Sequence, residues 1–111
     1  MANNYTKGRN LEYSVKERLR GLDYVVFRCA GSRPVDLIAI KQGNILLIER
    51  KSGLNPYLPS KQLNRIMDIS KNVNATPILV VRKRYRGIRW FKMAEHGLEE
   101  MRLKDLGEYC V

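Results

Sequence analysis

Two acidic residues and a lysine lie at the ends of a predicted β-hairpin. Asp36 begins one apolar segment, and Glu49 and Lys51 end the next. A two-residue turn at Gly43-Asn44 places Asp36 opposite Lys51 and diagonal to Glu49, and directly opposed residues share one face of a sheet. A turn that is longer by two residues keeps the shared face. We therefore expect the three charged side chains to project from the same side of the sheet.

This trio has two chemical interpretations. One is a salt bridge at the strand ends between Lys51 and either Asp36 or Glu49. The other is a metal site, because Mg²⁺ binds carboxylate oxygens and keeps several water ligands, while a nearby lysine can help to deprotonate the attacking water. In a basic protein, the second interpretation predicts hydrolysis of phosphodiesters in nucleic acid.

The chain is strongly basic, and its charge is unevenly distributed. Its 111 residues carry a formal net charge of +10, with +13 in residues 1–92 and −3 in residues 93–111. A surplus of this kind favours a polyanionic partner. The length fits one domain, 1–111, and we expect a core at about residues 5–93 with an acidic C-terminal tail at 94–111.

Hydrophobic periodicity predicts an α/β fold with the order α-β-β-β-α-β-β. The expected helices are 7–22 and 60–73, and they flank a mixed five-stranded sheet formed by strands 24–29, 36–41, 45–49, 77–81 and 88–93. No apolar stretch approaches the roughly 20 residues of a membrane span, and the two cysteines form neither a zinc motif nor a disulfide framework. These features predict a cytoplasmic protein with no membrane partner.

Several motifs, taken in order, resemble a known family. Asp36 followed by Glu49-Arg50-Lys51 resembles the (P)D…ExK signature of restriction-endonuclease-like nucleases. Within that superfamily the chain is similar to the archaeal Holliday junction resolvases over about residues 5–93, through Lys7-Gly8…Glu12, residues 28–39, residues 48–51, Tyr57, residues 77–81 and Trp90-Phe91. The resemblance implies a restriction-endonuclease-like core.

The resemblance also implies roles for individual residues. Glu12, Asp36 and Glu49 would hold Mg²⁺, for which Mn²⁺ would substitute, together with a backbone carbonyl near Arg50. Lys51 would act on the attacking water. Ser32 would support catalysis from a loop, and Gln62 resembles a glutamine found after ExK in many members of the superfamily. The chain departs from the family at Tyr13, where an arginine usually follows the helix glutamate. No organic cofactor is implied.

Basic residues form two groups that could contact DNA phosphates. One group lies near the expected active site and the other is a turn at residues 82–89. The residues expected to bind DNA are Lys7, Arg9, Arg28, Arg33, Arg50 and Lys61 in the first group, and Arg82, Arg84 and Arg86 in the second. Contacts to phosphates position a nucleic acid without reading its bases, so we expect recognition by shape.

The expected function is metal-dependent cleavage of opposed strands in a four-way DNA junction. Because such a junction has two equivalent scissile phosphates, we expect a homodimer, with the apolar arc of helix 60–73 and Trp90-Phe91 at its interface. Two alternatives stay open. One is a related nuclease acting on flaps, mismatches or duplex DNA, and the other is a basic nucleic-acid-binding module without catalytic activity.

Overall fold

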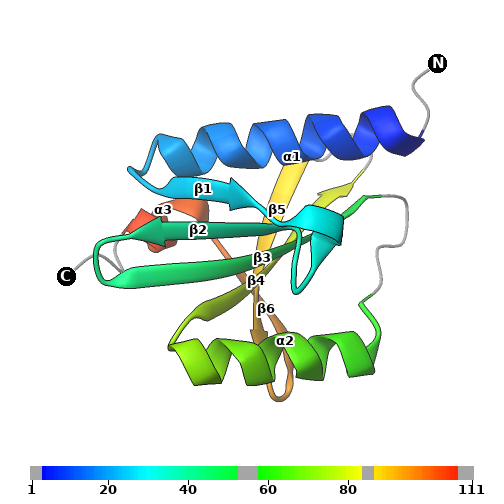
Figure 1. Cartoon of the computed structure of the whole chain (residues 1–111). Coiled ribbons are helices and arrows are strands. Elements are labelled where there is room, and N and C mark those ends of the chain that lie inside the picture. The colour runs from blue at the N-terminus through cyan, green and yellow to red at the C-terminus, as the bar shows by residue number, and fades with distance from the viewer. Residues whose placement is uncertain (1–3, 53–57, 84–86, 108–111) are drawn as a thin grey trace.

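The computed structural model describes residues 4–52, 58–83 and 87–107, which form a sheet with a long helix on each face (Figure 1). The second helix occupies the range predicted for it, and the predicted strands lie within three residues of their observed bounds. In chain order the elements are α1 (Asn4–Arg20), β1 (Val25–Arg28), the short 3-10 helix η1 (Ala30–Ser32), β2 (Leu37–Lys41), β3 (Asn44–Ser52), α2 (Ser60–Val73), β4 (Thr76–Lys83), β5 (Gly87–Ala94), β6 (Gly97–Met101) and α3 (Leu103–Gly107).

The sheet has six strands in the order in which they occur along the chain, β1 to β6. Every neighbouring pair is antiparallel except β3 and β4, which are parallel. A parallel pair needs a long crossover connection, and α2 provides it. The α/β class and the mixed sheet were predicted correctly, but the prediction of five strands was wrong by one.

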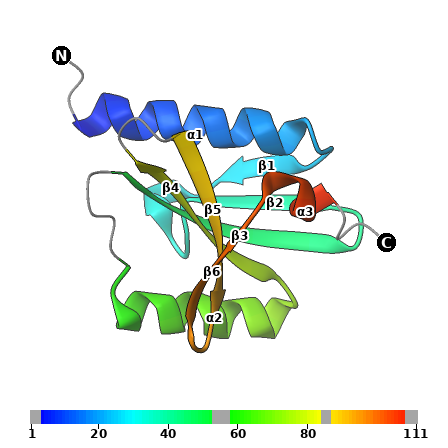
Figure 2. The same ribbon diagram turned by 180° about the vertical axis from the view of Figure 1, so that it is seen from behind.

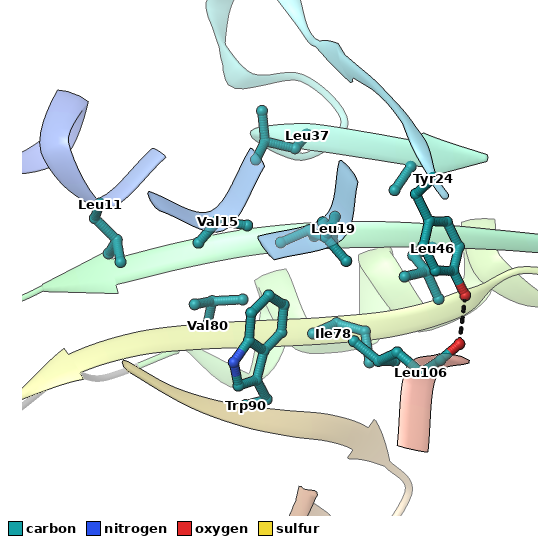
Figure 3. Packing of buried hydrophobic residues seen from close by; sticks show 12 residues of the cluster. Leu11, Val15, Leu19, Tyr24, Leu37, Leu46, Ile78, Val80, Trp90 and Leu106 are labelled. Atoms are coloured by element: carbon teal, nitrogen blue, oxygen red, sulfur yellow. Dashed lines mark hydrogen bonds between the residues drawn. The ribbon is translucent and has the colours of Figure 1, made fainter. Parts of the chain in front are cut away.

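The face of the sheet that α1 covers has a continuous apolar core. Leu11, Val15 and Leu19 recur at helical spacing in α1 and are fully buried. Figure 3 shows these side chains among residues of β2, β3, β4 and β5. The cluster members from these strands are Leu37, Leu46, Ile48, Ile78, Val80 and Trp90. This packing fixes the N-terminal helix over β1 and β3. Among the described helices, none has the length and apolar content of a membrane span.

The opposite face is covered by α2. Ile66 of α2 packs against Leu47, Leu79 and Val81 of the central strands, together with Val35. The apolar run of β3 therefore alternates between the two cores, with Leu47 directed towards α2 and its neighbours on the strand towards α1. This explains why the run lacks polar alternation, since a strand covered on both faces is apolar throughout.

The segment after residue 93 belongs to the fold. β6 pairs with β5 and leads to α3 (Figure 2). Leu106 of α3 is fully buried in the core beneath α1. The Tyr24 hydroxyl donates a hydrogen bond to the Leu106 carbonyl oxygen at 2.7 Å (Figure 3). The expected end of the core near residue 93 was therefore wrong. The sequence hid this because β6 is an edge strand whose middle residues, Leu98–Glu100, are exposed and lack a buried pattern.

Candidate active site

The register of the β2–β3 hairpin decides which of the expected catalytic residues lie opposite one another. Lys41 pairs with Asn44, so the turn residues are Gln42 and Gly43 rather than the predicted Gly43-Asn44. Gly43 has a φ of 81°, a left-handed conformation that favours glycine at the second position of such a turn. The predicted pairing of Asp36 with Lys51 was therefore wrong. The observed register, continued one residue beyond β2, brings Asp36 level with Glu49 and keeps the two on one face.

Asp36 and Glu49 form a buried acid pair, with 8% and 4% of their surfaces exposed. The Arg50 backbone N–H donates a hydrogen bond to Asp36 Oδ2 at 2.9 Å, and Gln62 Nε2 donates one to Glu49 Oε2. The other carboxylate oxygen of Glu49 is buried and receives no hydrogen bond from any described donor. Two carboxylates packed together in this way cannot easily both carry a charge.

The pKa values of the two acids shift in opposite directions. Burial, together with the hydrogen bond and the charge of Asp36, raises the pKa of Glu49 to about 8. Burial alone would raise the pKa of Asp36, but hydrogen bonds from Glu49, Ser32 and the Arg50 backbone N–H outweigh it and lower that pKa. Near neutral pH the pair is therefore one carboxylate and one carboxylic acid. A divalent cation could take the place of the shared proton.

Lys51 lies two residues beyond Glu49 on β3, so the two side chains share a face. The positive charge of Lys51 lowers the pKa of Glu49 and opposes part of the effect of burial. Among the described residues, no acid comes within 4.0 Å of the lysine ammonium to form an ion pair. The salt-bridge interpretation of the trio therefore does not match the described contacts.

Two neutral side chains reach the acid pair from outside the hairpin. Ser32, in the η1 turn where Gly31 has a φ of 66°, donates a hydrogen bond that helps to lower the pKa of Asp36. Gln62 comes from the first turns of α2 and contacts Glu49. Figure 1 shows why both can reach the site, since η1 and the start of α2 lie at the end of the sheet where β3 ends.

Glu12 occupies a different environment. It lies on α1 with 6% of its surface exposed, and three cations surround its carboxylate. The distances to its oxygens are 3.4 Å from Lys16 Nζ, 3.2 Å from Arg28 Nε and 3.6 Å from Arg50 Nη2. In the described part of the chain, no group of three metal-ligating side chains lies close enough to hold one ion. The described residues therefore do not bring Glu12, Asp36 and Glu49 together as one metal-binding group, and the role of Glu12 as a metal ligand stays a prediction.

The alternation of side chains along β3 explains why Glu12 and Glu49 lie on different sides of the sheet. Glu49 points to the side of α2, whereas its neighbour Arg50 points to the side of α1, because successive residues of a strand alternate. The Arg50 guanidinium lies between the two sites, with Nη2 near Glu12 and Nε 4.0 Å from Asp36 Oδ1. Lys16 was missed as a contributor, although its position four residues after Glu12 is a recognisable helical ion-pair spacing.

The other residues expected to bind DNA are dispersed. Arg33 and Lys61 are exposed. Arg82 Nη2 instead donates a hydrogen bond to Ser14 Oγ of α1 at 3.2 Å. In the same basic turn, Arg89 is paired with Glu100 of β6. The side chains of Lys7 and Arg9, and the whole of Arg84 and Arg86, lie outside the described residues.

The structure buries only part of the expected dimer surface. Trp90 is buried in the core beneath α1, whereas Phe91, Met67 and Ile69 are partly buried against the core beneath α2 and Val73 of α2 is 48% exposed. A different apolar surface is exposed on β1 and β2. It consists of Val25, Phe27 and Ile40, which we call the β1–β2 patch. The register places these three side chains on one face, because Val25 pairs with Ile40 and Phe27 lies two residues from Val25.

The arrangement defines a class of protein, namely an α/β protein whose mixed six-stranded sheet is flanked by helices and carries a buried acid pair at one end. Over residues 3–110 the sequence matches the model of a family described as archaeal Holliday junction resolvase (Hjc). The chain belongs to this archaeal Holliday junction resolvase family, as its motifs indicated.

Individual relatives agree with this assignment. The crossover junction endodeoxyribonuclease Hjc of Methanocaldococcus jannaschii is 30% identical over 84 residues, which cover 74% of this chain and 63% of that relative. The structure of Archaeoglobus fulgidus Hjc, described as a Holliday junction resolvase, matches with a TM-score of 0.74 at 15% identity. That match covers 92% of this chain and 96% of the A. fulgidus chain. At this identity the structural match supports the fold.

Proposed function

We propose that this protein is a homodimeric endodeoxyribonuclease that resolves four-way DNA junctions by Mg²⁺-dependent hydrolysis in opposed strands, acting in the cytoplasm. The observation that carries the proposal is the buried acid pair of Asp36 and Glu49 beside Lys51, in a basic chain of the resolvase family. The acid pair has the ligands that Mg²⁺ prefers and lies next to a cation suited to a hydrolytic reaction.

The acid pair fits a divalent cation. Glu49 Oε1 is buried without a described donor, and the two carboxylates share one proton that a metal ion would displace. Asp36 and Glu49 would hold Mg²⁺ or Mn²⁺, together with the backbone carbonyl of Arg50 that the family resemblance adds. When bound, the ion would polarise the scissile phosphate and lower the pKa of a coordinated water.

The protein side chains supply the remaining steps. Lys51 orients the attacking water, assists its deprotonation and offsets the negative charge that develops on phosphorus. Gln62 and Ser32 hold the two carboxylates in place through the hydrogen bonds already described. Attack of the water on phosphorus breaks the bond to one of the two sugar oxygens, and a strand break follows.

Binding of the junction would rest on phosphate contacts. The exposed Arg28, Arg33 and Lys61 lie around the site end of the sheet. The further basic residues proposed to bind DNA are Lys7, Arg9, Arg82, Arg84 and Arg86. These contacts fix the path of the DNA arms but carry no sequence information. Arg82 would contribute mainly by anchoring α1 through Ser14.

The homodimer follows from the substrate. A junction has two equivalent scissile phosphates, and one subunit carries a single acid pair, so paired cuts need a second copy. The β1–β2 patch is the best candidate surface, because Phe27 is 52% exposed and lies beside two further exposed apolar side chains. Contiguous exposed apolar residues commonly mark interaction surfaces.

One assay tests the proposal and separates it from its alternatives. The protein is incubated with a four-way junction, a duplex, a flap and a single strand, each with Mg²⁺ or with EDTA. We expect cleavage of opposed junction strands in Mg²⁺ and none in EDTA. Preferred cleavage of flaps or duplex would assign a related nuclease. Tight junction binding without cleavage in either Mg²⁺ or Mn²⁺ would assign a binding module.

A further inference from the structure

Tyr13 is the most exposed large apolar side chain among the described residues, with 65% of its surface accessible. It lies on α1 two residues after Leu11 and two residues before Val15, both of which are fully buried. Two residues correspond to about 200° around an α-helix. The tyrosine ring therefore points away from the sheet, on the side of α1 opposite to the one that packs on the core.

The helix that carries this ring is positively charged. Residues 4–20 contain five basic side chains against two acidic ones. One of the two acids, Glu17, is paired with Arg20 at 3.8 Å. Proteins that bind unstacked bases combine such basic surfaces with exposed aromatic rings, because the cations hold the phosphates while a ring stacks on a base.

The ring does not belong to an apolar surface of the size that a protein partner needs. None of the other exposed large apolar side chains in the described residues lies on α1; they are Val25, Phe27, Ile40, Val73 and Leu98. A stable protein interface buries about 1,000 Å² or more, whereas one aromatic side chain buries about 200 Å². A basic helix with a single outward ring is therefore better suited to nucleic acid than to another protein.

Tyr13 also lies close to the acid pair. It directly follows Glu12, whose carboxylate lies 3.6 Å from Arg50 Nη2, and Arg50 Nε lies 4.0 Å from Asp36 Oδ1. Figure 1 shows the N-terminal half of α1 over the end of the sheet where η1 lies and β3 ends. A DNA strand whose scissile phosphate lies at the acid pair therefore has nucleotides nearby that can reach Tyr13.

The shape of the substrate indicates which base is available to the ring. Inside a duplex, each base is covered on both faces by its neighbours. At an open branch point, each arm ends in a base pair whose inner face is uncovered, and an aromatic side chain can stack on that face.

We propose that Tyr13 stacks on a base at the branch point of the DNA and thereby favours branched DNA over duplex DNA. This inference rests on the proposed function, since it assumes a branched DNA strand at the acid pair. It adds a specificity-determining residue that binds neither metal nor phosphate.

The first test measures binding to a four-way junction and to a duplex in EDTA, so that no cleavage takes place. Y13A should lower the affinity for the junction by about 5-fold to 100-fold, the range for loss of one base stacked on an aromatic side chain. The affinity for the duplex should stay unchanged. The slope of log affinity against log salt should equal that of wild type, because no charge is removed.

The control for this test is L98A, which removes an exposed apolar side chain on β6 and should bind both DNAs like wild type. An unchanged junction affinity in Y13A, or an equal loss for junction and duplex, would overturn the inference. Circular dichroism verifies the helix content of Y13A, which should be retained because alanine has the highest helix propensity.

Y13F separates stacking by the ring from a hydrogen bond by the hydroxyl. It keeps the ring, so it should bind the junction like wild type, whereas a loss equal to that of Y13A would show that the hydroxyl makes the contact. A junction with 2-aminopurine at the branch point reports stacking directly. Its fluorescence should be lower in the saturated wild-type and Y13F complexes than in the Y13A complex, and equal fluorescence in all three would contradict stacking.

The two proposals can fail separately. If the wild-type protein cleaves junctions but Y13A binds them like wild type, the stacking role is wrong and the nuclease stands. If Y13A loses junction affinity as expected but the wild-type protein cleaves nothing, the stacking role stands on a binding module and the proposed hydrolysis is wrong.

Discussion

Buried acids have different surroundings on the two sides of β3. On the α2 side, Asp36 and Glu49 face each other and one oxygen of Glu49 has no described donor. On the α1 side, Glu12 is equally buried but has three cations within 3.6 Å. The acid pair holds a shared proton that a metal ion could replace, whereas the carboxylate of Glu12 is already neutralised by its ion pairs.

Residue type alone therefore does not define a metal ligand. A carboxylate that already neutralises arginine and lysine would have to break those ion pairs before it could bind Mg²⁺. A pair of carboxylates that shares one proton has only to release it. The partners of each acid, rather than its presence in a motif, decide its chemistry.

The largest expected effect is on cleavage by variants of the acid pair. D36N keeps the side-chain shape but removes a metal ligand, so the cleavage rate should fall by about 10³-fold or more, the equivalent of roughly 4 kcal/mol. Junction binding should be retained. E12Q, its counterpart on the α1 side, should lose much less. Single-turnover kinetics in Mg²⁺ measure both rates. Near-wild-type cleavage by D36N would contradict the assignment of Asp36 as a metal ligand.

Lys51 should give the next largest effect. Since its proposed role is on the water and the developing charge, K51A should slow cleavage by about 10²-fold to 10⁴-fold. Its melting temperature should match that of wild type, because no described acid pairs with the ammonium. Parallel kinetic and thermal measurements distinguish this from the salt-bridge interpretation, which predicts loss of stability with retained specific activity.

The β1–β2 patch lies on the same side of the sheet as Glu49 and is the proposed dimer interface. F27E should bury an unpaired charge in the proposed interface at a cost of several kcal/mol and yield monomers. These monomers should still nick a junction but lose paired cuts. Analytical ultracentrifugation and a cruciform-plasmid assay test both points. The control L98E alters an exposed leucine on β6 and should stay dimeric; a wild-type monomer that makes paired cuts would contradict the dimer.

The smallest effect concerns stability and pH in the absence of metal. The pKa of Glu49 is raised from 4.5 to about 8, so the folded protein holds a proton that the unfolded chain releases between these values. Stability should therefore fall as pH rises from about 4.5 to about 8. The lowered pKa of Asp36 acts only at lower pH, where it removes stability as pH falls.

Thermal unfolding in EDTA measures this dependence. Between about pH 5.5 and pH 8.5, the melting temperature of wild type should fall by several degrees more than that of E49Q, which cannot release this proton. Parallel curves for the two proteins would show that Glu49 is ionised like an ordinary surface acid.

Much of the fold was readable because its elements carry strong periodic signals. The apolar run of β3 and the helix 60–73 were placed correctly, since both are buried against several neighbours. The hairpin register was wrong by two residues because the choice between Gly43 and Asn44 as the second turn residue depends on φ at Gly43. The edge strand β6 was missed because an exposed strand has little apolar pattern.

The candidate site was readable only in part. Asp36, Glu49 and Lys51 could be placed on one face by the parity of the hairpin, and this survives the register error. The ion pairs of Glu12 with Arg28 and Arg50 join residues from α1, β1 and β3, and no local spacing specifies them. Family resemblance grouped Glu12 with the acid pair, whereas its physical surroundings separate them.

The most direct test of this separation measures the binding of Mn²⁺ to the DNA-free protein by calorimetry at about pH 7. The account predicts that wild type and E12Q bind Mn²⁺ with similar affinity and stoichiometry, whereas D36N and E49Q lose this binding. Loss of Mn²⁺ binding by E12Q to the same extent as by D36N would contradict the account, because Glu12 would then be a metal ligand like the other two acids.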